Sequence, residues 1–84
     1  MNRFQVISVN RVPGREDALI VLETLEGSIE TITGRLFDED GEGAWNLTSI
    51  ALHEPQASSE AVNRRMVGLE GEGVPKVGCV LVNW

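Results

Sequence analysis

The chain has 84 residues, and 13 acidic against seven basic side chains leave a net charge of −6. This length is that of one compact domain, residues 1–84, and 42% hydrophobic content with 24% charged residues excludes a disordered chain. The acidic balance repels nucleic-acid backbones at long range and argues against nonspecific binding to them.

The cysteine content and the N-terminal segment bear on the compartment. Cys79 is the only cysteine, so the chain cannot form an internal disulfide or a cysteine-rich zinc site. Residues 1–10 contain no apolar stretch typical of a signal peptide, and no segment reaches the ~20 apolar residues of a membrane span. We therefore expect a cytoplasmic protein that does not contact a membrane.

The first half of the chain alternates apolar segments with turn residues. Segment 4–12 has a mixed alternation of apolar residues, ends at Pro13-Gly14, and predicts a first strand. The continuous apolar run 18–25 predicts a second, central strand. Residues 29–33 are rich in β-branched side chains and predict a third strand that forms a hairpin with the second.

The middle of the chain is more polar. The acidic, glycine-rich segment 37–43 cannot bury its polar groups and predicts an exposed loop. Residues 44–52 predict a fourth strand with Trp45 and Leu47 facing the core, together with Ile50 or Leu52. Segment 56–64 fits a short helical turn or a loop equally well.

The last third of the chain predicts two more strands, at 65–70 and 77–84. Six short strands with turn signals between them predict an all-β fold, a small six-stranded, mainly antiparallel barrel with at most one short helical turn. The residues predicted to fill its interior are Val6, Leu19, Val21, Ile29, Ile32, Leu47, Val67, Leu69 and Val80.

The order of turn and strand residues resembles a known module. Val12-Pro13-Gly14-Arg15, Gly27-Ser28-Ile29 leading to Gly34, Val67-Gly68-Leu69-Glu70-Gly71 and Pro75-Lys76-Val77-Gly78-Cys79-Val80-Leu81 are together similar to the second-domain β-barrel of translational GTPases such as elongation factor Tu. The similarity covers nearly the whole chain, although Gly27 and Gly34 lie further apart than the corresponding glycines of that family.

The resemblance implies a β-barrel that lies beside a GTP-binding domain and helps to hold the aminoacylated end of tRNA or an analogous partner. No G-x-x-x-x-G-K-[ST] phosphate loop occurs in this sequence, so GTP hydrolysis is not implied for this chain.

One acidic segment has the spacing of a calcium loop. Asp38, Asp40 and Glu42 stand at the first, third and fifth positions, with Gly43 at the sixth. Ser49 stands at the twelfth position, where such a loop needs a bidentate glutamate. We therefore interpret the segment as a solvated loop and expect no metal site.

Two further residues are candidates for catalysis. His53 lies beside Glu54, but the sequence offers no nucleophile motif to complete a triad. Cys79 lies in an apolar run, where a thiol usually behaves as a small hydrophobic residue. We expect no catalytic residue and no cofactor, and hence that the chain is not an enzyme.

The function predicted first is that of a noncatalytic β-barrel module that binds a protein partner or associates with itself. Segment 77–84 carries apolar residues on both faces of a strand, so we predict a dimer through an exposed strand, with Trp84 and Val82 as partner-binding residues.

Two other classes of function are open. The resemblance suggests an RNA- or ribonucleoprotein-binding module related to translation factors, whose only candidates for phosphate contacts would be Arg3, Arg11, Arg15, Arg35, Arg64 and Arg65. The third is an enzyme with a composite site between subunits.

Overall fold

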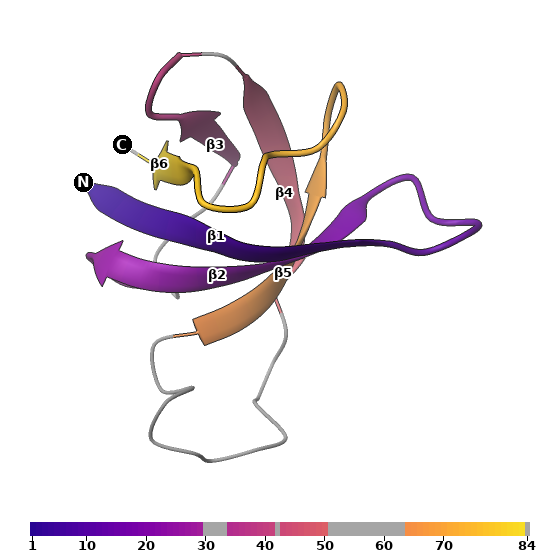
Figure 1. Cartoon of the computed structure of the whole chain (residues 1–84), viewed down its shortest axis with the longest axis horizontal. Coiled ribbons are helices and arrows are strands. Elements are labelled where there is room, and N and C mark those ends of the chain that lie inside the picture. The colour runs from indigo at the N-terminus through magenta and orange to yellow at the C-terminus, as the bar shows by residue number, and fades with distance from the viewer. Residues whose placement is uncertain (30–33, 42, 51–63, 84) are drawn as a thin grey trace.

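The computed structural model describes residues 1–29, 34–41, 43–50 and 64–83. In these ranges the chain forms strands and no α-helix: β1 (Asn2–Arg11), β2 (Ala18–Glu26), β3 (Arg35–Asp38), β4 (Ala44–Ile50), β5 (Arg64–Glu70) and β6 (Val80–Asn83). They form a closed barrel in the order β1-β2-β5-β4-β3-β6, with every neighbouring pair antiparallel (Figure 1). The predicted six-stranded antiparallel barrel is therefore confirmed. Of the segment 56–64, only Arg64 is described, and it begins β5.

The core fills the barrel with side chains from all six strands. Of the predicted interior residues, Val6, Ile29, Val67 and Leu69 are buried, and Leu47 is half-buried against the core. Ile32 lies outside the described residues. The largest side chains with almost no exposed surface are Phe4, Ile20, Leu22, Leu36, Leu69 and Leu81.

Two β-bulges explain why the apolar pattern changes phase along β1 and β4. In β1 the pairing with β2 shifts between Val6 and Ser8, so the inward side chains change from Phe4 and Val6 to Val9. In β4 the pairing with β5 shifts between Leu47 and Ser49 in the same way, and Ile50 then packs against the core. The break in the apolar alternation within segment 4–12 is thus caused by the bulge between Val6 and Ser8.

The predicted inner face of the second strand is wrong by one residue. Leu19 and Val21, predicted inside, are both half-buried on the outer face, while Ala18, Ile20 and Leu22 are buried. Ile20 lies opposite Val9 on one side and Val67 on the other, and residues paired across neighbouring strands share a face. Because every residue from Ala18 to Leu22 is apolar, the sequence does not indicate which side chains face inward. The pairing of β2 with β1 and β5 determines this.

The predicted third strand, residues 29–33, lies outside the described residues except for Ile29. The next strand that the structure describes is β3, which runs from Arg35 to Asp38 and pairs with β4 and β6. Phe37 and Asp38, predicted in an exposed loop, therefore belong to a strand, and they lie opposite Val82 and Leu81 of β6. This short pairing closes the barrel.

The C-terminal strand is shorter than predicted and is not an exposed strand. β6 pairs with β1 on one side and with β3 on the other. Leu81, rather than the predicted Val80, fills the interior, and Val80 is half-buried. Neighbours on both sides leave β6 no open edge in the described structure, so the predicted route to a dimer is wrong for this strand.

The end of the barrel that holds the chain ends is tied by amide side chains. The Asn83 Nδ2 group donates a hydrogen bond to the carbonyl of Arg35 at 2.9 Å. Asn2 lies opposite Asn83 in the β1–β6 pairing, and its Oδ1 accepts a hydrogen bond from the Ser28 N–H at 3.0 Å. Asn83 is 8% exposed, and its Oδ1 accepts a hydrogen bond from the Asn2 Nδ2 group at 3.4 Å, so its side chain links β6 to β1 and β3.

No helix in the described ranges is long and apolar enough to cross a membrane.

Candidate functional site

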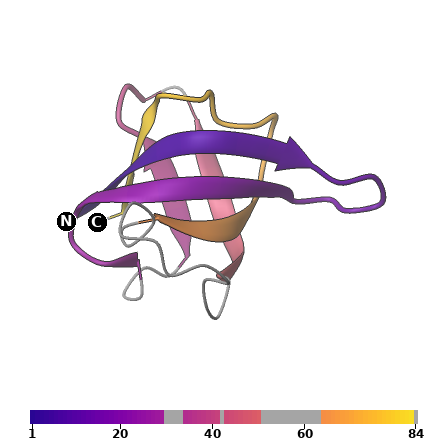
Figure 2. The ribbon, with the colours of Figure 1, turned by 60° about the horizontal axis from the view of Figure 1, so that its bottom comes forward.

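The most distinctive surface feature is a projecting hairpin, residues 8–18, which we call the arm. It consists of the end of β1, the turn at Pro13-Gly14 and the beginning of β2, and it extends beyond the rest of the barrel (Figure 2). Gly14 has a φ of +87°, a conformation that other residues rarely adopt. The Arg15 N–H closes the turn by donating to the carbonyl of Val12 at 3.1 Å.

One side of the arm is an open strand edge. Residues Asn2 to Gln5 of β1 pair with β6. On the same side the Val6 N–H donates a hydrogen bond to the Cys79 carbonyl at 2.9 Å, and the Val6 carbonyl accepts one from the Gly78 N–H at 2.8 Å. Beyond Val6, no backbone hydrogen bond joins β1 on this side to any described residue. We call residues 7–11 on this side the open edge.

The bulge determines which backbone groups the open edge presents. In a strand, side-chain direction and the direction of the N–H and C=O groups alternate together. Val6 has an inward side chain and directs its backbone groups to the β6 side. After the bulge the inner face passes to Val9, opposite Ile20, and to Arg11, opposite the buried Ala18. Val9 and Arg11 therefore direct their N–H and C=O groups to the open edge.

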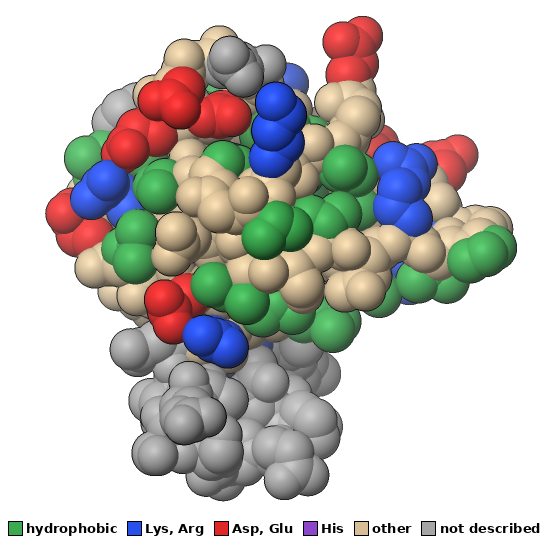
Figure 3. Space-filling model, viewed as in Figure 1, with side chains coloured by type: hydrophobic (Ala, Val, Ile, Leu, Met, Phe, Trp, Pro, Cys, Tyr) green, Lys and Arg blue, Asp and Glu red, His purple; other side chains and the backbone are tan. Residues whose placement is uncertain are grey.

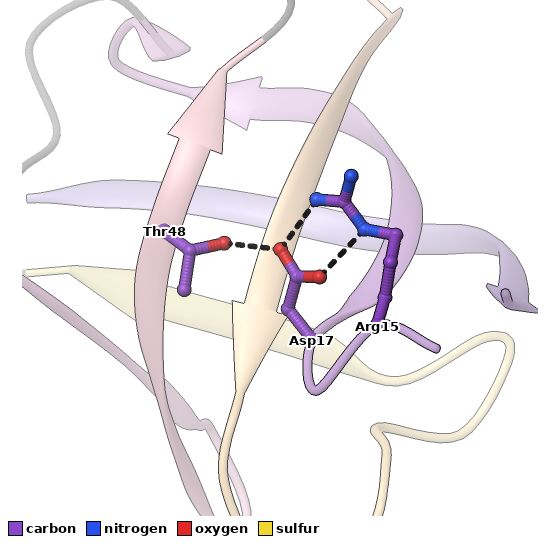
Figure 4. Close-up of polar contacts among 3 residues, drawn as sticks. All are labelled: Arg15, Asp17 and Thr48. Carbon is purple, nitrogen blue, oxygen red and sulfur yellow. Dashed lines mark hydrogen bonds and ion pairs between the residues drawn. The ribbon is translucent and has the colours of Figure 1, made fainter. Parts of the chain in front are cut away.

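The base of the arm is fastened by a polar cluster, Arg15, Asp17 and Thr48, which we call the clamp (Figure 4). Both Asp17 carboxylate oxygens accept hydrogen bonds at 2.8 Å, Oδ1 from the Arg15 Nε–H and Oδ2 from a terminal nitrogen of the same guanidinium. Oδ2 also accepts the Thr48 hydroxyl at 2.6 Å. The clamp thus joins the turn of the arm to the bulge of β4.

The clamp needs a glycine beneath it and a charged carboxylate within it. A Cβ atom at Gly68 of β5 would collide with Thr48 Oγ1, Asp17 Oδ2 and Ser49 Oγ. The hydrogen bonds from Arg15 and then Thr48 lower the pKa of Asp17 from 3.8 to about 2. Asp17 is therefore ionised and fully engaged at neutral pH, so we assign it a positioning role. The sequence did not reveal the clamp, because Thr48 lies 31 residues from Asp17.

Apolar side chains lie on the outer surface around the arm. Leu19 and Val21 of β2 are half-buried on the outer face, and Met66, opposite Val21, is 38% exposed. Val12 in the turn of the arm is 39% exposed, and Val77, in the segment that precedes β6, is 65% exposed. The arm and its surroundings therefore offer apolar contacts beside the open edge.

Three of the six arginines named for RNA contact are paired with carboxylates. A terminal nitrogen of the Arg3 guanidinium lies 2.7 Å from Glu39 Oε2, and Arg64 Nε lies 3.3 Å from Glu23 Oε1. Arg15 belongs to the clamp. The Arg35 guanidinium stacks over the Phe37 ring at 5.9 Å. On the face shown in Figure 3, basic side chains stand apart from one another among acidic and apolar ones. That face shows no basic groove.

The acidic turn after β3 is organised by its own backbone. Asp38 Oδ1 accepts a hydrogen bond from the Asp40 N–H at 2.8 Å, and the Asp38 carbonyl accepts the Gly41 N–H at 2.8 Å. The described residues contain no cluster of three or more histidine, cysteine or acidic side chains able to hold a metal ion. Glu42 lies outside them.

Cys79 is partly buried, and this burial raises the pKa of its thiol, as do the nearby carboxylates of Asp38 and Asp40. The thiol is therefore protonated at neutral pH and is not an activated nucleophile. His53 lies outside the described residues.

A hollow of about 550 Å³ is lined by Arg35, Gly43, Ala44, Glu70, Gly71 and Glu72, and two of these residues, Gly43 and Gly71, lie close to the indole ring of Trp45. Trp45 is 5% exposed and anchors the core, as predicted, while its indole nitrogen is buried without a hydrogen-bond partner. A Cβ atom at Gly43 or Gly71 would collide with the indole ring. The two glycines thus leave room for the ring at the surface of the hollow.

Of the two predicted partner-binding residues, the structure describes Val82, which is 3% exposed. Val82 lies opposite Arg3 of β1 and Phe37 of β3. Trp84 lies outside the described residues, and the partner-binding role of the two residues stays a prediction.

Comparison with known proteins adds no relative: no family model, no curated protein and no solved structure matches this chain. The resemblance to the second-domain barrel of translational GTPases therefore stays a prediction, as does the RNA-binding role it suggests.

Proposed function

We propose that this chain is a noncatalytic β-barrel module that acts by binding protein, a partner chain or a second copy of itself. The observation that supports this proposal is the arm, whose open edge presents backbone groups that are bonded to no described residue. Such an edge is a template for an added strand from another chain.

The polar groups of the described structure favour this role over catalysis. Both oxygens of Asp17 are occupied by the clamp, and the Cys79 thiol is held in its protonated form. The proposal includes a cytoplasmic location, for which the ground is the single cysteine of the sequence.

RNA binding is the competing proposal, and the pairing of Arg3, Arg15 and Arg64 with carboxylates weighs against it. Site-specific photocross-linking in cells separates the two. A cross-linking residue placed at Val12 should give adducts that protease removes and nuclease leaves intact. The same residue placed at Asp40, an exposed position in the acidic turn, is the control and should give few adducts. Adducts at Val12 that are sensitive to nuclease alone would overturn the proposed function.

A further inference from the structure

We propose that the open edge pairs with the open edge of a second copy of this chain, as an antiparallel twofold ladder over residues 8–12 centred on Asn10. The inference rests on the proposed protein-binding function and specifies both its surface and its partner. Strand edges are joined by main-chain hydrogen bonds, so the first condition is that donors and acceptors of the two copies meet.

The register centred on Asn10 satisfies this condition. Val9 and Arg11 direct their backbone groups to the open edge, as shown above, and this register places Val9 opposite Arg11 of the second copy. The N–H and C=O groups of Val9 then bond to the C=O and N–H groups of Arg11 of the second copy, and by symmetry Arg11 bonds in the same way to Val9 of the second copy. A twofold arrangement uses the same edge of both copies and leaves no edge free for a third.

The side chains are compatible with this register. Asn10 lies opposite Leu19, on the outer face, and would meet Asn10 of the second copy on the twofold axis. Two primary amides can exchange hydrogen bonds reciprocally, because each carries both donors and an acceptor. Val12, 39% exposed in the turn, would be partly covered by pairing with Ser8 of the second copy.

Charge and shape favour a second copy as the partner. The arm contains two basic and two acidic side chains, so it has no net charge, and the net charge of −6 lies on the rest of the chain. The turn of the arm projects from the barrel (Figure 2), and in an antiparallel pairing the two β1 strands run in opposite directions, so the two barrels would extend away from the twofold axis in opposite directions. The arm is therefore a place where two copies can meet without bringing their acidic bodies together.

One feature limits the strength of the dimer and supplies its test. In this register Arg11 is the diagonal neighbour of Arg11 of the second copy, at a backbone separation of about 7–8 Å. Salt screens charges at this distance, since the Debye length is about 8 Å at physiological ionic strength. Raising the salt concentration should therefore strengthen the dimer, whereas it would weaken an association driven by opposite charges.

The experiment is sedimentation of the parent chain from about 20 μM to 1 mM, compared with two variants at one position. Arg11→Gln keeps the backbone N–H and removes the repulsion, so it should tighten the dimer about two- to fivefold. Arg11→Pro removes the N–H that faces the open edge but none that pairs with β2, and should weaken the dimer about tenfold or more. Cross-strand contacts between Asn10 and Leu19, observed by nuclear magnetic resonance, would show that the arm of each variant remains folded.

A third variant tests the register. Asn10→Asp places two carboxylates on the twofold axis, so it should weaken the dimer at neutral pH and restore it below about pH 4. A dimer that is indifferent to this change overturns the register.

The outcomes separate this inference from the proposed function. A parent chain that stays monomeric throughout the concentration range overturns the second copy as partner, while the cross-linking experiment still decides whether the chain binds protein. A dimer that forms equally well with Arg11→Pro, or one that weakens as salt is raised, overturns the open edge as the contact surface and leaves self-association standing.

Discussion

The two halves of β1 differ in what surrounds them, although they belong to one continuous strand. From Asn2 to Val6 the strand is bonded on both sides, and Phe4 has no exposed surface. From Ser8 to Arg11 it is bonded to β2 and, on its other side, to no described residue, although Val9 still packs against the core. The bulge between Val6 and Ser8 marks the change. In this fold a single inserted residue separates the half of a strand that is paired on both sides from the half that has an open edge.

The comparison implies unequal local stability along the strand. Segments with few buried contacts and open backbone hydrogen bonds unfold locally at a lower free energy than the core. On its open edge the arm makes no backbone hydrogen bond to a described residue, and it is attached through the clamp and through pairing with β2. We therefore expect the barrel half to unfold only with the whole domain, and the arm to open separately.

The strongest test of this difference removes one side chain from each half. Phe4→Ala should lower the free energy of unfolding by about 3–5 kcal/mol, because the ring has no exposed surface and its loss leaves a cavity. Val12→Ala in the arm is the control, with an expected change within about 0.5 kcal/mol. Urea unfolding followed by fluorescence measures both. Similar losses for the two variants would contradict the division of β1.

A second substitution loosens the arm from below. Gly68→Ala inserts a methyl group where Thr48, Asp17 and Ser49 now meet, and such overpacking typically costs about 1–3 kcal/mol. Hydrogen exchange of the arm amides should increase more than that of the barrel amides. The exposed Gly73→Ala variant is not a suitable control, because Gly73 has a φ of +67°. Val77→Ala, at a side chain 65% exposed, is the control and should change neither the free energy of unfolding nor the hydrogen exchange of the arm amides.

The clamp should also respond to acid, in a direction that its pKa determines. The Asp17 pKa is about 2 in the folded chain and 3.8 without its partners, so the charged form stabilises the fold fully above about pH 4. This contribution is lost as the pH falls through about 2. The stability difference between the parent chain and Asp17→Asn should therefore be constant from neutral pH to about pH 4 and shrink below it.

Thermal unfolding at a series of pH values measures this difference. Thr48→Val removes one donor and keeps the Arg15 pair, so its effect should be smaller than that of Asp17→Asn. A difference that grows as the solution becomes more acidic would show that the charge of Asp17 does not hold the arm.

The smallest effect is expected in the acidic turn after β3, whose strand does not pair with either strand of the arm. Replacing Asp38, Asp40 and Glu42 with the corresponding amides should change stability little, since the amide side chain of Asp38→Asn would keep the oxygen acceptor that now bonds the Asp40 N–H. Added calcium should leave the melting temperature of the parent chain unchanged. A rise in melting temperature with calcium would show a metal site in this turn.

The sequence predicted the barrel because each strand is short, apolar and bounded by turn residues. It did not predict which residues of β2 face inward, because Ala18 to Leu22 are all apolar and only pairing with β1 and β5 selects Ala18, Ile20 and Leu22. The change of phase at Val6, Ile7 and Val9 was visible in the sequence, and it was the sign of the bulge.

The candidate site was harder to predict than the fold, for two physical reasons. Arg15 and Asp17 have the composition of an ordinary charged turn, and only the folded chain brings Thr48 to them. The open edge depends on where β6 begins, and that follows from the left-handed backbone of Gly78, with a φ of +94°, and the bonds of Gly78 and Cys79 to Val6. Neither feature leaves a local pattern of residue types.

The pairing of Asn2 with Asn83 has a consequence for how this barrel can be combined with other chains. Both strands that carry these residues reach the same point of the barrel, on the side away from the arm (Figure 1). A short linker could join them, and new ends could be opened at the Pro13-Gly14 turn, so circular permutation should preserve the pairing of the other strands. The same geometry would allow the barrel to be inserted into a surface loop of a host domain, with the arm pointing outward and free to make contacts.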